Sequence, residues 1–253
     1  MPVDIEGALR EGLQRTLARN GLVVAGLLFV LALLNGLFSA GAVAELSPSG
    51  VPSPFSGMPY APVVGVSPGL AFVVWLVLAV ATSVVTIGAT RTFVTDETER
   101  LPGEHFTRSV VLAVLNLFVG GIIFVVAVGI GLVLLVVPGL FLLVSLFFWE
   151  VVVIVEDRSF VAGYRASWRL TRGHRWRLLG LGIAVAIVTL VVNVAFGLPG
   201  AFLPGLVAFV VAQVGSALVV VFTLATTART YDQLLALEAE AAAEGTAEAE
   251  PAG

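Results

Sequence analysis

Cysteine and lysine are absent from this chain of 253 residues, and histidine occurs only twice, as His105 and His174. Without cysteine the chain can form no disulfide, thiolate nucleophile or thiolate metal site. The two histidines lie in separate polar segments, so neither a zinc site nor a histidine-centred catalytic triad is expected. No glycine-rich segment is followed by the Lys-Ser pair of a phosphate-binding loop. We therefore expect no catalytic residue, no metal, no cofactor and no enzymatic activity.

Charge is also scarce: charged residues make up 12% of the chain, whereas 58% of it is hydrophobic. A soluble domain of this length could not bury so much apolar surface in one core, so a bilayer is the natural solvent for the excess. All 13 cationic side chains are arginine, and six of the 17 acids fall in the last 25 residues. Such a composition is typical of a salt-adapted cell with a GC-rich genome, and codon bias alone explains it equally well.

Six apolar segments are each long enough to cross about 30 Å of hydrocarbon as a helix. The first two are separated by a polar loop, and the other four form two long uncharged runs. At a rise of about 1.5 Å per residue each run spans the bilayer twice, so each must be a helical hairpin. The sequence therefore predicts an all-α polytopic bundle with six spans, at residues 21–44, 69–90, 109–131, 135–155, 178–198 and 205–228.

Proline-glycine pairs mark the expected turns of both hairpins. Pro138-Gly139 lies in the first uncharged run and a second pair lies at residues 199–200. Such pairs commonly interrupt helices, so each predicts the point at which the chain reverses. Gly129 and Gly131 offer a competing turn in the first run.

Arginine placement predicts the orientation. In a six-span threading all 13 arginines fall on one side of the membrane, whereas residues 45–68 and 199–205 contain none. By the positive-inside rule the arginine-bearing side faces the cytoplasm. We thus expect a multi-pass protein of the cell membrane with both termini in the cytoplasm. The proline-rich segment at residues 45–68 is expected to be an irregular external loop.

The segments that flank the spans have different expected characters. Over residues 1–20, apolar side chains recur every four positions from Ile5 to Leu17, which predicts an amphipathic helix lying in the headgroup plane. An ordinary solvated leader is the alternative. Cleavage of the first span as a secretory signal is not expected, because its apolar region is too long. Residues 231–253 are expected to form an acidic cytoplasmic tail, helical to about residue 243 and then disordered.

The polar segment between spans four and five has the clearest pattern. Helical spacing places Phe160, Tyr164 and Trp168 on one arc of residues 159–173 and the arginines on another. This predicts an interfacial helix with an aromatic face and a basic edge. The arginines either bind anionic lipid headgroups, at roughly 1 kcal/mol each, or only set topology and anchor span five. The candidate lipid- or partner-binding residues are Tyr164, Arg165, Trp168, Arg169, Arg172, Arg175 and Arg177.

Polar side chains also occur inside the predicted spans. Glu150 and Asn116 lie at similar depths in spans four and three, so we expect a hydrogen bond between them, with a proton or cation relay as the alternative. A deeper set in spans one, five and six lies about 21 to 22 Å from the arginine-bearing side at helical rise. Matching depth predicts a cluster of amides that packs the helices, with a substrate site as the alternative: Asn35, Asn193 and Gln213.

The stretch from Pro138 to Leu181 resembles the membrane domain found in glycerophosphoryl diester phosphodiesterase membrane proteins and related uncharacterised families. The matching elements are Pro138-Gly139, Glu156 at the end of a span, Ser167-Trp168-Arg169-Leu170-Thr171-Arg172-Gly173, and Arg175-Trp176-Arg177. The resemblance covers about a sixth of the chain and implies a multi-helix membrane module whose own activity is not established. In fused members hydrolysis belongs to a separate soluble domain, which is not expected here. Related members often carry an arginine near Ser145 and a proline near Val151, and both are missing from this chain.

Two function hypotheses follow. The first is a non-enzymatic membrane module that binds membrane lipids, through anionic headgroups, or a protein partner. Residues 159–177 would form the contact, and no nucleic acid is expected as a partner. The second is a small-solute or ion transporter that uses Glu150 and the intramembrane amides. A hydrated path from Glu150 to the deeper amides would favour transport, whereas a sealed bundle would favour the first hypothesis.

Overall fold

The computed structural model describes residues 3–46, 67–95 and 97–249, and within them all regular structure is helical. In chain order the elements are α1 (Ile5–Leu17), α2 (Arg19–Leu46), α3 (Pro68–Val94), η1 (Gly103–Phe106), α4 (Val110–Leu134), α5 (Val136–Ser145), α6 (Trp149–Glu156), α7 (Phe160–Leu170), α8 (Arg175–Gly197), η2 (Leu198–Ala201) and α9 (Gly205–Ala249). Six stretches of the described residues are long and apolar enough to cross a membrane: Arg19–Phe38, Gly69–Val94, Val110–Leu134, Val136–Glu156, Arg175–Gly197 and Gly205–Ala243. The predicted all-α bundle with six spans is confirmed, and the chain is a multi-pass membrane protein.

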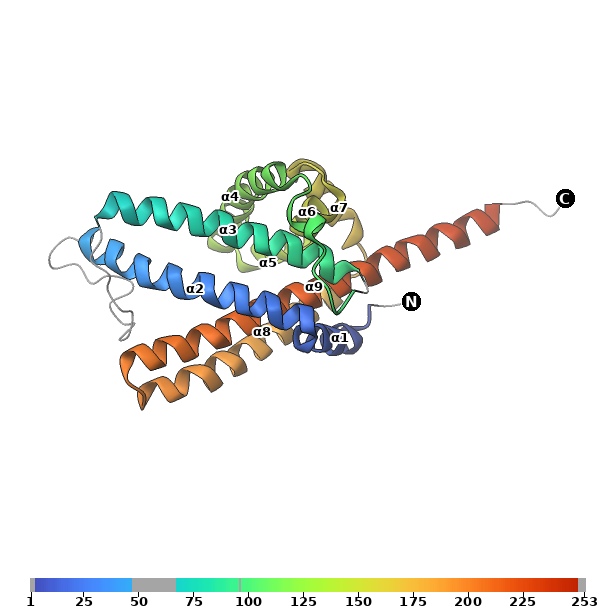
Figure 1. The fold of residues 1–253 in the computed structure, drawn as a ribbon. Helices are drawn as coiled ribbons and strands as arrows, with labels where there is room; N and C mark the ends of the chain where they lie inside the picture. The colour runs from blue at the N-terminus through green and yellow to red at the C-terminus, as the bar shows by residue number, and fades with distance from the viewer. Residues whose placement is uncertain (1–2, 47–66, 96, 250–253) are drawn as a thin grey trace.

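Helix α9 lies at the centre of the bundle. It packs against α1, α2, α3 and α8, and Figure 1 shows α2, α3, α8 and the first half of α9 running side by side. Between them, Val24 and Leu28 of α2 belong to the same buried cluster as Phe93 of α3 and Val221 and Ala225 of α9. The alanines of this cluster, which include Ala89, Ala217 and Ala225, let the helices approach closely, and such close packing is what holds spans together in lipid.

One end of the bundle carries the charged segments, and we define it as the polar end. Helices α1 and α7, the loop that contains η1 and the start of α8 gather there, whereas the turn from α8 to α9 lies at the far end (Figure 1). The spans leave much apolar surface uncovered: in the most apolar stretch of the second span only 11% of the residues are buried. The fourth span differs, because 50% of it is buried. Span four is therefore the one that the rest of the chain encloses.

The turn between α4 and α5 lies before the predicted Pro-Gly pair. Leu135 interrupts the helix with extended backbone, and Pro138 then falls in the first turn of α5, where a missing amide hydrogen costs no helical bond. Gly139 instead packs against α4, since a Cβ on Gly131 would come within 2.9 Å of the Cα of Gly139. The prediction of a turn at the pair is therefore wrong, because these glycines serve close packing. The other predicted turn, at residues 199–200, does fall in η2.

Span four is interrupted near its middle. Helix α5 ends at Ser145 and α6 begins at Trp149, so residues 146–148 form a turn with the tight hydrogen bonds of a 3-10 helix. The sequence gives no proline or glycine at this point. A side chain inserted from another helix is a recognised cause of such an interruption.

The flanking segments differ in detail from expectation. One face of α1 packs on α9, while Leu13 and Leu17 are 52% and 60% exposed. Helix α9 continues to Ala249, past the expected end near residue 243, because its alanine and glutamate residues have high helix propensity. Most of the predicted irregular loop, residues 47–66, lies outside the described residues.

Candidate functional site

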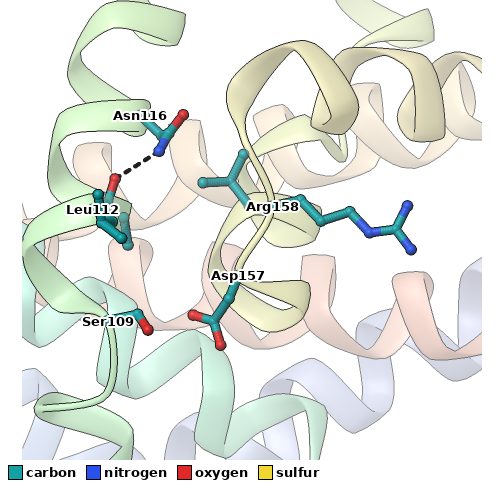
Figure 2. Close-up of a pocket in the computed structure, with 7 residues that line it drawn as sticks. Ser109, Leu112, Asn116, Asp157 and Arg158 are labelled. Carbon is teal, nitrogen blue, oxygen red and sulfur yellow. Dashed lines mark hydrogen bonds between the residues drawn. The ribbon is translucent and has the colours of Figure 1, made fainter.

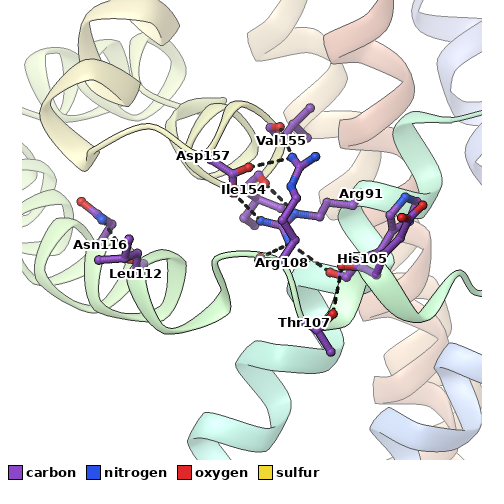
Figure 3. Close-up of polar contacts among 10 residues, drawn as sticks. Arg91, His105, Thr107, Arg108, Leu112, Asn116, Ile154, Val155 and Asp157 are labelled. Carbon is purple, nitrogen blue, oxygen red and sulfur yellow. Dashed lines mark hydrogen bonds and ion pairs between the residues drawn. The ribbon is translucent and has the colours of Figure 1, made fainter.

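A buried arginine holds the polar end together. Arg91 of α3 is 4% exposed, and its guanidinium donates to Ile154 O at 2.8 Å, His105 O at 3.0 Å, Arg108 O at 2.7 Å and the Asp157 carboxylate at 2.7 Å (Figure 3). These acceptors come from α6, from the loop that carries η1 and from the link between α6 and α7. A buried charge with this many acceptors is a structural junction, because removing any partner would leave it poorly compensated.

His105 of η1 belongs to the same junction, because its carbonyl oxygen accepts a hydrogen bond from Arg91. Its Nδ1 lies 3.1 Å from Thr92 Oγ1, whose own proton goes to Gly88 O at 2.8 Å, so Nδ1 carries the hydrogen and donates it to Thr92. Burial lowers the pKa of His105; Glu104 opposes that shift, and Arg91 and a second arginine add to it. The neutral imidazole is therefore the form that fits this site.

A small polar cavity lies beside the junction. Ser109 and Asp157 face it with φ angles of 49° and 52°, and they are the two non-glycine residues with positive φ in the described chain. Figure 2 shows the Arg158 side chain directed away from Asn116. Its volume of about 40 Å³ holds a few water molecules and no headgroup or metabolite. The lining residues are Ser109, Leu112, Ala113, Asn116, Val153, Asp157 and Arg158.

Asn116 does not meet Glu150, contrary to the predicted hydrogen bond. Its Nδ2 donates to Leu112 O at 2.8 Å, and its Oδ1 accepts from Phe160 N at 3.0 Å. Asn116 thus caps the first turn of α7, because the rotation of α4 directs its amide there. Glu150 is exposed in the first turn of α6 and has no hydrogen bond or ion pair among the described residues.

The three deeper amides are not brought together either. Asn35 and Asn193 are both exposed, and Asn193 Nδ2 donates to Thr189 O in its own helix at 2.8 Å. Gln213 faces α2, where a Cβ on Gly36 would lie 3.7 Å from its Nε2. Equal depth in the membrane therefore did not predict that the three side chains lie close together. The rotation of each helix about its axis determines which side chains contact one another.

Helix α7 is fastened to the bundle by its small residues. Gly163, Ala166 and Ser167 are buried, and the Trp149 ring lies 5.1 Å from the ring of Tyr164. The Tyr164 hydroxyl donates to Gly120 O of α4. Tyr164, a candidate lipid- or partner-binding residue, joins α7 to α4 and α6, because the buried face of α7 is set by its small side chains.

The outward side of α7 and the start of α8 form a surface that we define as the basic rim: Arg165, Trp168, Arg172 and Trp176. Trp168 is 41% exposed and Trp176 is 86% exposed. Arg165 and Arg172 are exposed, and neither guanidinium has a hydrogen-bond or ion-pair partner among the described residues. The basic rim therefore has two arginines without a partner among the described residues, Arg165 and Arg172, and two exposed tryptophan rings.

The other predicted arginines of this segment already have partners within the chain. Arg169 pairs with Glu238 of α9 at 2.9 Å, and Arg177 Nη1 donates to Val3 O at 3.1 Å. The Arg175 guanidinium lies between two rings, 4.5 Å from the centroid of Phe141 and 4.7 Å from that of Trp168. These contacts tie α7 and α8 to the rest of the polar end. The predicted set thus divides into structural residues and residues free to bind.

Two hydroxyl groups of α7 reach the interruption in span four. Ser167 Oγ accepts from Phe148 N at 3.1 Å and donates to Ser145 O at 3.0 Å, and Thr171 Oγ1 lies 3.2 Å from the same carbonyl. We define this pair, Ser167 and Thr171, as the clip. It satisfies backbone groups that the interruption leaves without helical partners, as a membrane interior requires.

Ser167, Thr171 and Trp176 belong to the stretch that carries the family resemblance, but sequence reasoning assigned no contact to any of them. The signal for Trp176 was present, because a tryptophan between two arginines at the start of a span is typical of the headgroup level. No local signal identifies the clip, since its partners lie 19 to 26 residues away in another helix. Among the described residues no group of three or more His, Cys, Asp or Glu side chains is placed to hold a metal ion.

Comparison with known proteins identifies the family of the chain. Residues 3–234 match the model of a family described as a domain of unknown function (DUF7847), so the match covers the first five spans and most of the sixth. No curated protein and no solved structure matches the chain. The functional inference therefore depends on the geometry of the polar end.

Proposed function

The chain belongs to the DUF7847 family, and we propose that it is a non-enzymatic membrane module that binds anionic lipid headgroups through the basic rim. The observation that carries this proposal is two uncommitted arginines beside two exposed tryptophans at the polar end. Guanidinium groups bind phosphate with paired hydrogen bonds, and tryptophan is enriched at headgroup level. An anionic phospholipid offers both the phosphate and the interfacial position that this surface suits.

Three other arginines of the polar end differ from Arg165 and Arg172 in their contacts. Arg91, Arg169 and Arg177 have acceptors inside the chain, so their charge is used in holding the fold. Arg165 and Arg172 are left for an external acceptor. Near a charged leaflet each contributes roughly 1 kcal/mol of attraction. This attraction supports a binding role for the two arginines in addition to a role in setting topology.

We also propose that α1 lies in the headgroup plane. Its inner face, with Ala8 and Gly12, is buried against the bundle, whereas Leu13, Leu17 and Arg10 are exposed. An apolar stripe flanked by arginine suits a helix that rests on the membrane surface. The support for the amphipathic character is this division between a buried, small-residue face and an exposed leucine stripe.

We propose further that the polar end faces the cytoplasm across the cell membrane, with both termini on that side. The support is that the arginines gather at one end of the bundle, which the positive-inside rule assigns to the cytoplasm.

The kinship with the membrane domain of glycerophosphoryl diester phosphodiesterase membrane proteins is part of the same proposal. The residues that carry the resemblance fall in α5 to α8, and they include Ser167 and Thr171 of the clip. Ser145, where related members often carry arginine, provides the carbonyl that the clip binds. Hydrogen bonds of Ser167 and Thr171 to span four would explain why the residues of the resemblance include a serine and a threonine at these two positions.

Native mass spectrometry of the full chain in neutral micelles tests the lipid proposal. The apparent Kd is measured for phosphatidylglycerol, which is anionic, and for phosphatidylcholine, which is zwitterionic. We expect the unmodified chain to prefer phosphatidylglycerol. The double variant Arg165→Gln/Arg172→Gln should lose about 2 kcal/mol of that binding, or roughly thirtyfold.

The matched control is Arg100→Gln, which removes an exposed arginine from a different loop at the same end. This variant should keep the preference for phosphatidylglycerol. A preference that survives in the double variant, or an equal loss in Arg100→Gln, would overturn the proposal.

Small-solute or ion transport is a second candidate, favoured by one observation: span four is interrupted next to Glu150. Interrupted helices form the sites of many transporters, and an ionisable side chain within a span is a functional candidate by default. Against it, the intramembrane polar residues do not converge. Proton flux into proteoliposomes that Glu150→Gln abolishes would establish transport, and flux that is equal in both chains would exclude this role for Glu150.

A further inference from the structure

The interruption of span four has no cause in its own sequence. Residues 142–153 contain neither proline nor glycine, the residues that usually interrupt a helix. Another recognised cause of a sharp break is a side chain inserted into the i→i−4 hydrogen-bond ladder. Here that side chain is Ser167, which takes the amide of Phe148 and the carbonyl of Ser145 out of the ladder.

The clip fits this position as both donor and acceptor. The Ser167 hydroxyl accepts at 3.1 Å and donates at 3.0 Å, so both of its functions are used. The Thr171 proton is shared between Ser145 O at 3.2 Å and Trp168 O at 3.3 Å. Ser145, Ser167 and Thr171 are all 0% exposed, so water does not replace these bonds.

We infer that span four has two states: broken when the clip is docked, and continuous when α7 withdraws it. Without the hydroxyls, Phe148 N and Ser145 O would be unsatisfied inside the membrane, which is unfavourable. The nearest remedy is local, because Phe148 N can return to Val144 O and Trp149 N to Ser145 O. These bonds restore one helix over Val136–Glu156, long enough to cross the membrane as a unit.

The ends of α7 have the backbone that a moving element needs. Asp157, before the helix, and Gly173, after it, are two of the three residues with positive φ in the described chain. Asp157 is held by ion pairs to Arg91 and Arg108, both at 2.7 Å, which fixes that end. Gly173 has a φ of 88°, a conformation that glycine adopts without strain, so the chain can change direction at the other end of the helix. Withdrawal of the clip would turn α7 about its first residue and would break the contacts of Tyr164 with Gly120 and of Arg169 with Glu238.

Lipid binding and the state of span four are linked through this helix. The clip lies on the buried face of α7, and Arg165 and Trp168 of the basic rim lie on its exposed face. A headgroup that holds α7 in its docked position favours the broken form, and by reciprocity the broken form favours headgroup binding. This link rests on the proposed lipid binding, whereas the two states of span four do not.

One labelling scheme reads the break directly. Phe147-Phe148 is the single Phe-Phe pair in the sequence, so phenylalanine labelled with ¹³C and ¹⁵N gives one carbonyl-to-amide cross-peak, on the amide that donates to Ser167. The full chain is measured in nanodiscs of phosphatidylcholine and of phosphatidylglycerol. We expect the Phe147 and Phe148 shifts of a tight turn, with the turn form more populated in phosphatidylglycerol.

The variant Ser167→Ala/Thr171→Val should move these shifts to helical values and abolish their dependence on lipid. The matched control is Thr90→Val, which removes a buried hydroxyl that bonds within its own helix. If the double variant does not fold, Ser167→Cys keeps the size of the side chain and weakens its hydrogen bonds. Turn shifts that persist after removal of the hydroxyl would overturn the two-state inference.

The two claims fail separately. If the chain prefers phosphatidylglycerol by mass spectrometry but its Phe148 peak is the same in both nanodiscs, the lipid proposal stands and the link through α7 is wrong. If the preference itself is missing, the lipid proposal fails, and the response of the peak to Ser167→Ala still decides whether span four has two states.

Discussion

At the scale of single residues, Gly131 shows how a missing side chain positions a span. A Cβ there would come within 2.9 Å of the Cα of Gly139, and backbone cannot turn aside as a flexible side chain can. We expect Gly131→Ala to push α4 from α5 and to lower the free energy of unfolding by about 1–3 kcal/mol. Gly129→Ala, with nothing within 4 Å of the new Cβ, is the control for unfolding in micelles. Equal losses in the two variants would contradict this packing.

His105 makes the stability of the polar end depend on pH. Its folded pKa is lowered, chiefly by burial. Below the ordinary histidine pKa of about 6.5 the unfolded chain therefore binds a proton that the folded chain does not. Stability is full above that pH and falls as the pH drops through it. Thermal unfolding at pH 7.5 and 5.5 should show a larger fall in Tm for the unmodified chain than for His105→Gln, and parallel falls would refute the assignment.

At the scale of elements, the spans could be predicted and their facing could not. Length and apolar character determine whether a helix crosses a bilayer, so the six spans could be predicted from the lengths of the apolar segments. The interruption at residues 146–148 depends on Ser167, which lies in a different helix, and no local pattern indicates it. The same limit explains Tyr164 and Asn116: both were located in the right helices, and neighbouring helices determined what they contact.

The ion pair between α7 and α9 gives a prediction at this scale. Arg169 pairs with Glu238 at 2.9 Å, and both side chains are partly exposed. Glu238→Gln should release Arg169 to the basic rim and tighten the binding of phosphatidylglycerol by about fivefold, the effect of roughly 1 kcal/mol. Glu240→Gln removes a nearby exposed acid as the control in the same mass-spectrometric titration. Tighter binding in both variants would mean that general charge, and not the ion pair, is responsible.

At the scale of the whole molecule, the absence of cysteine makes the orientation directly measurable. Single cysteines are introduced as Glu240→Cys, beyond the polar end, and Leu198→Cys, in the turn at the far end. In intact cells a membrane-impermeant maleimide should label Leu198→Cys, and Glu240→Cys should react only after the cells are opened. The reverse pattern would show that the polar end faces outward.

The central claim is that this membrane module selects anionic lipid at its polar end. The most direct measurement is electron spin resonance of spin-labelled phosphatidylglycerol and phosphatidylcholine around the full chain in bilayers, at low and high salt. We predict that a larger fraction of phosphatidylglycerol is immobilised at low salt, that added salt reduces the difference, and that Arg165→Gln/Arg172→Gln removes it. Equal immobilised fractions of the two lipids at low salt would contradict the claim.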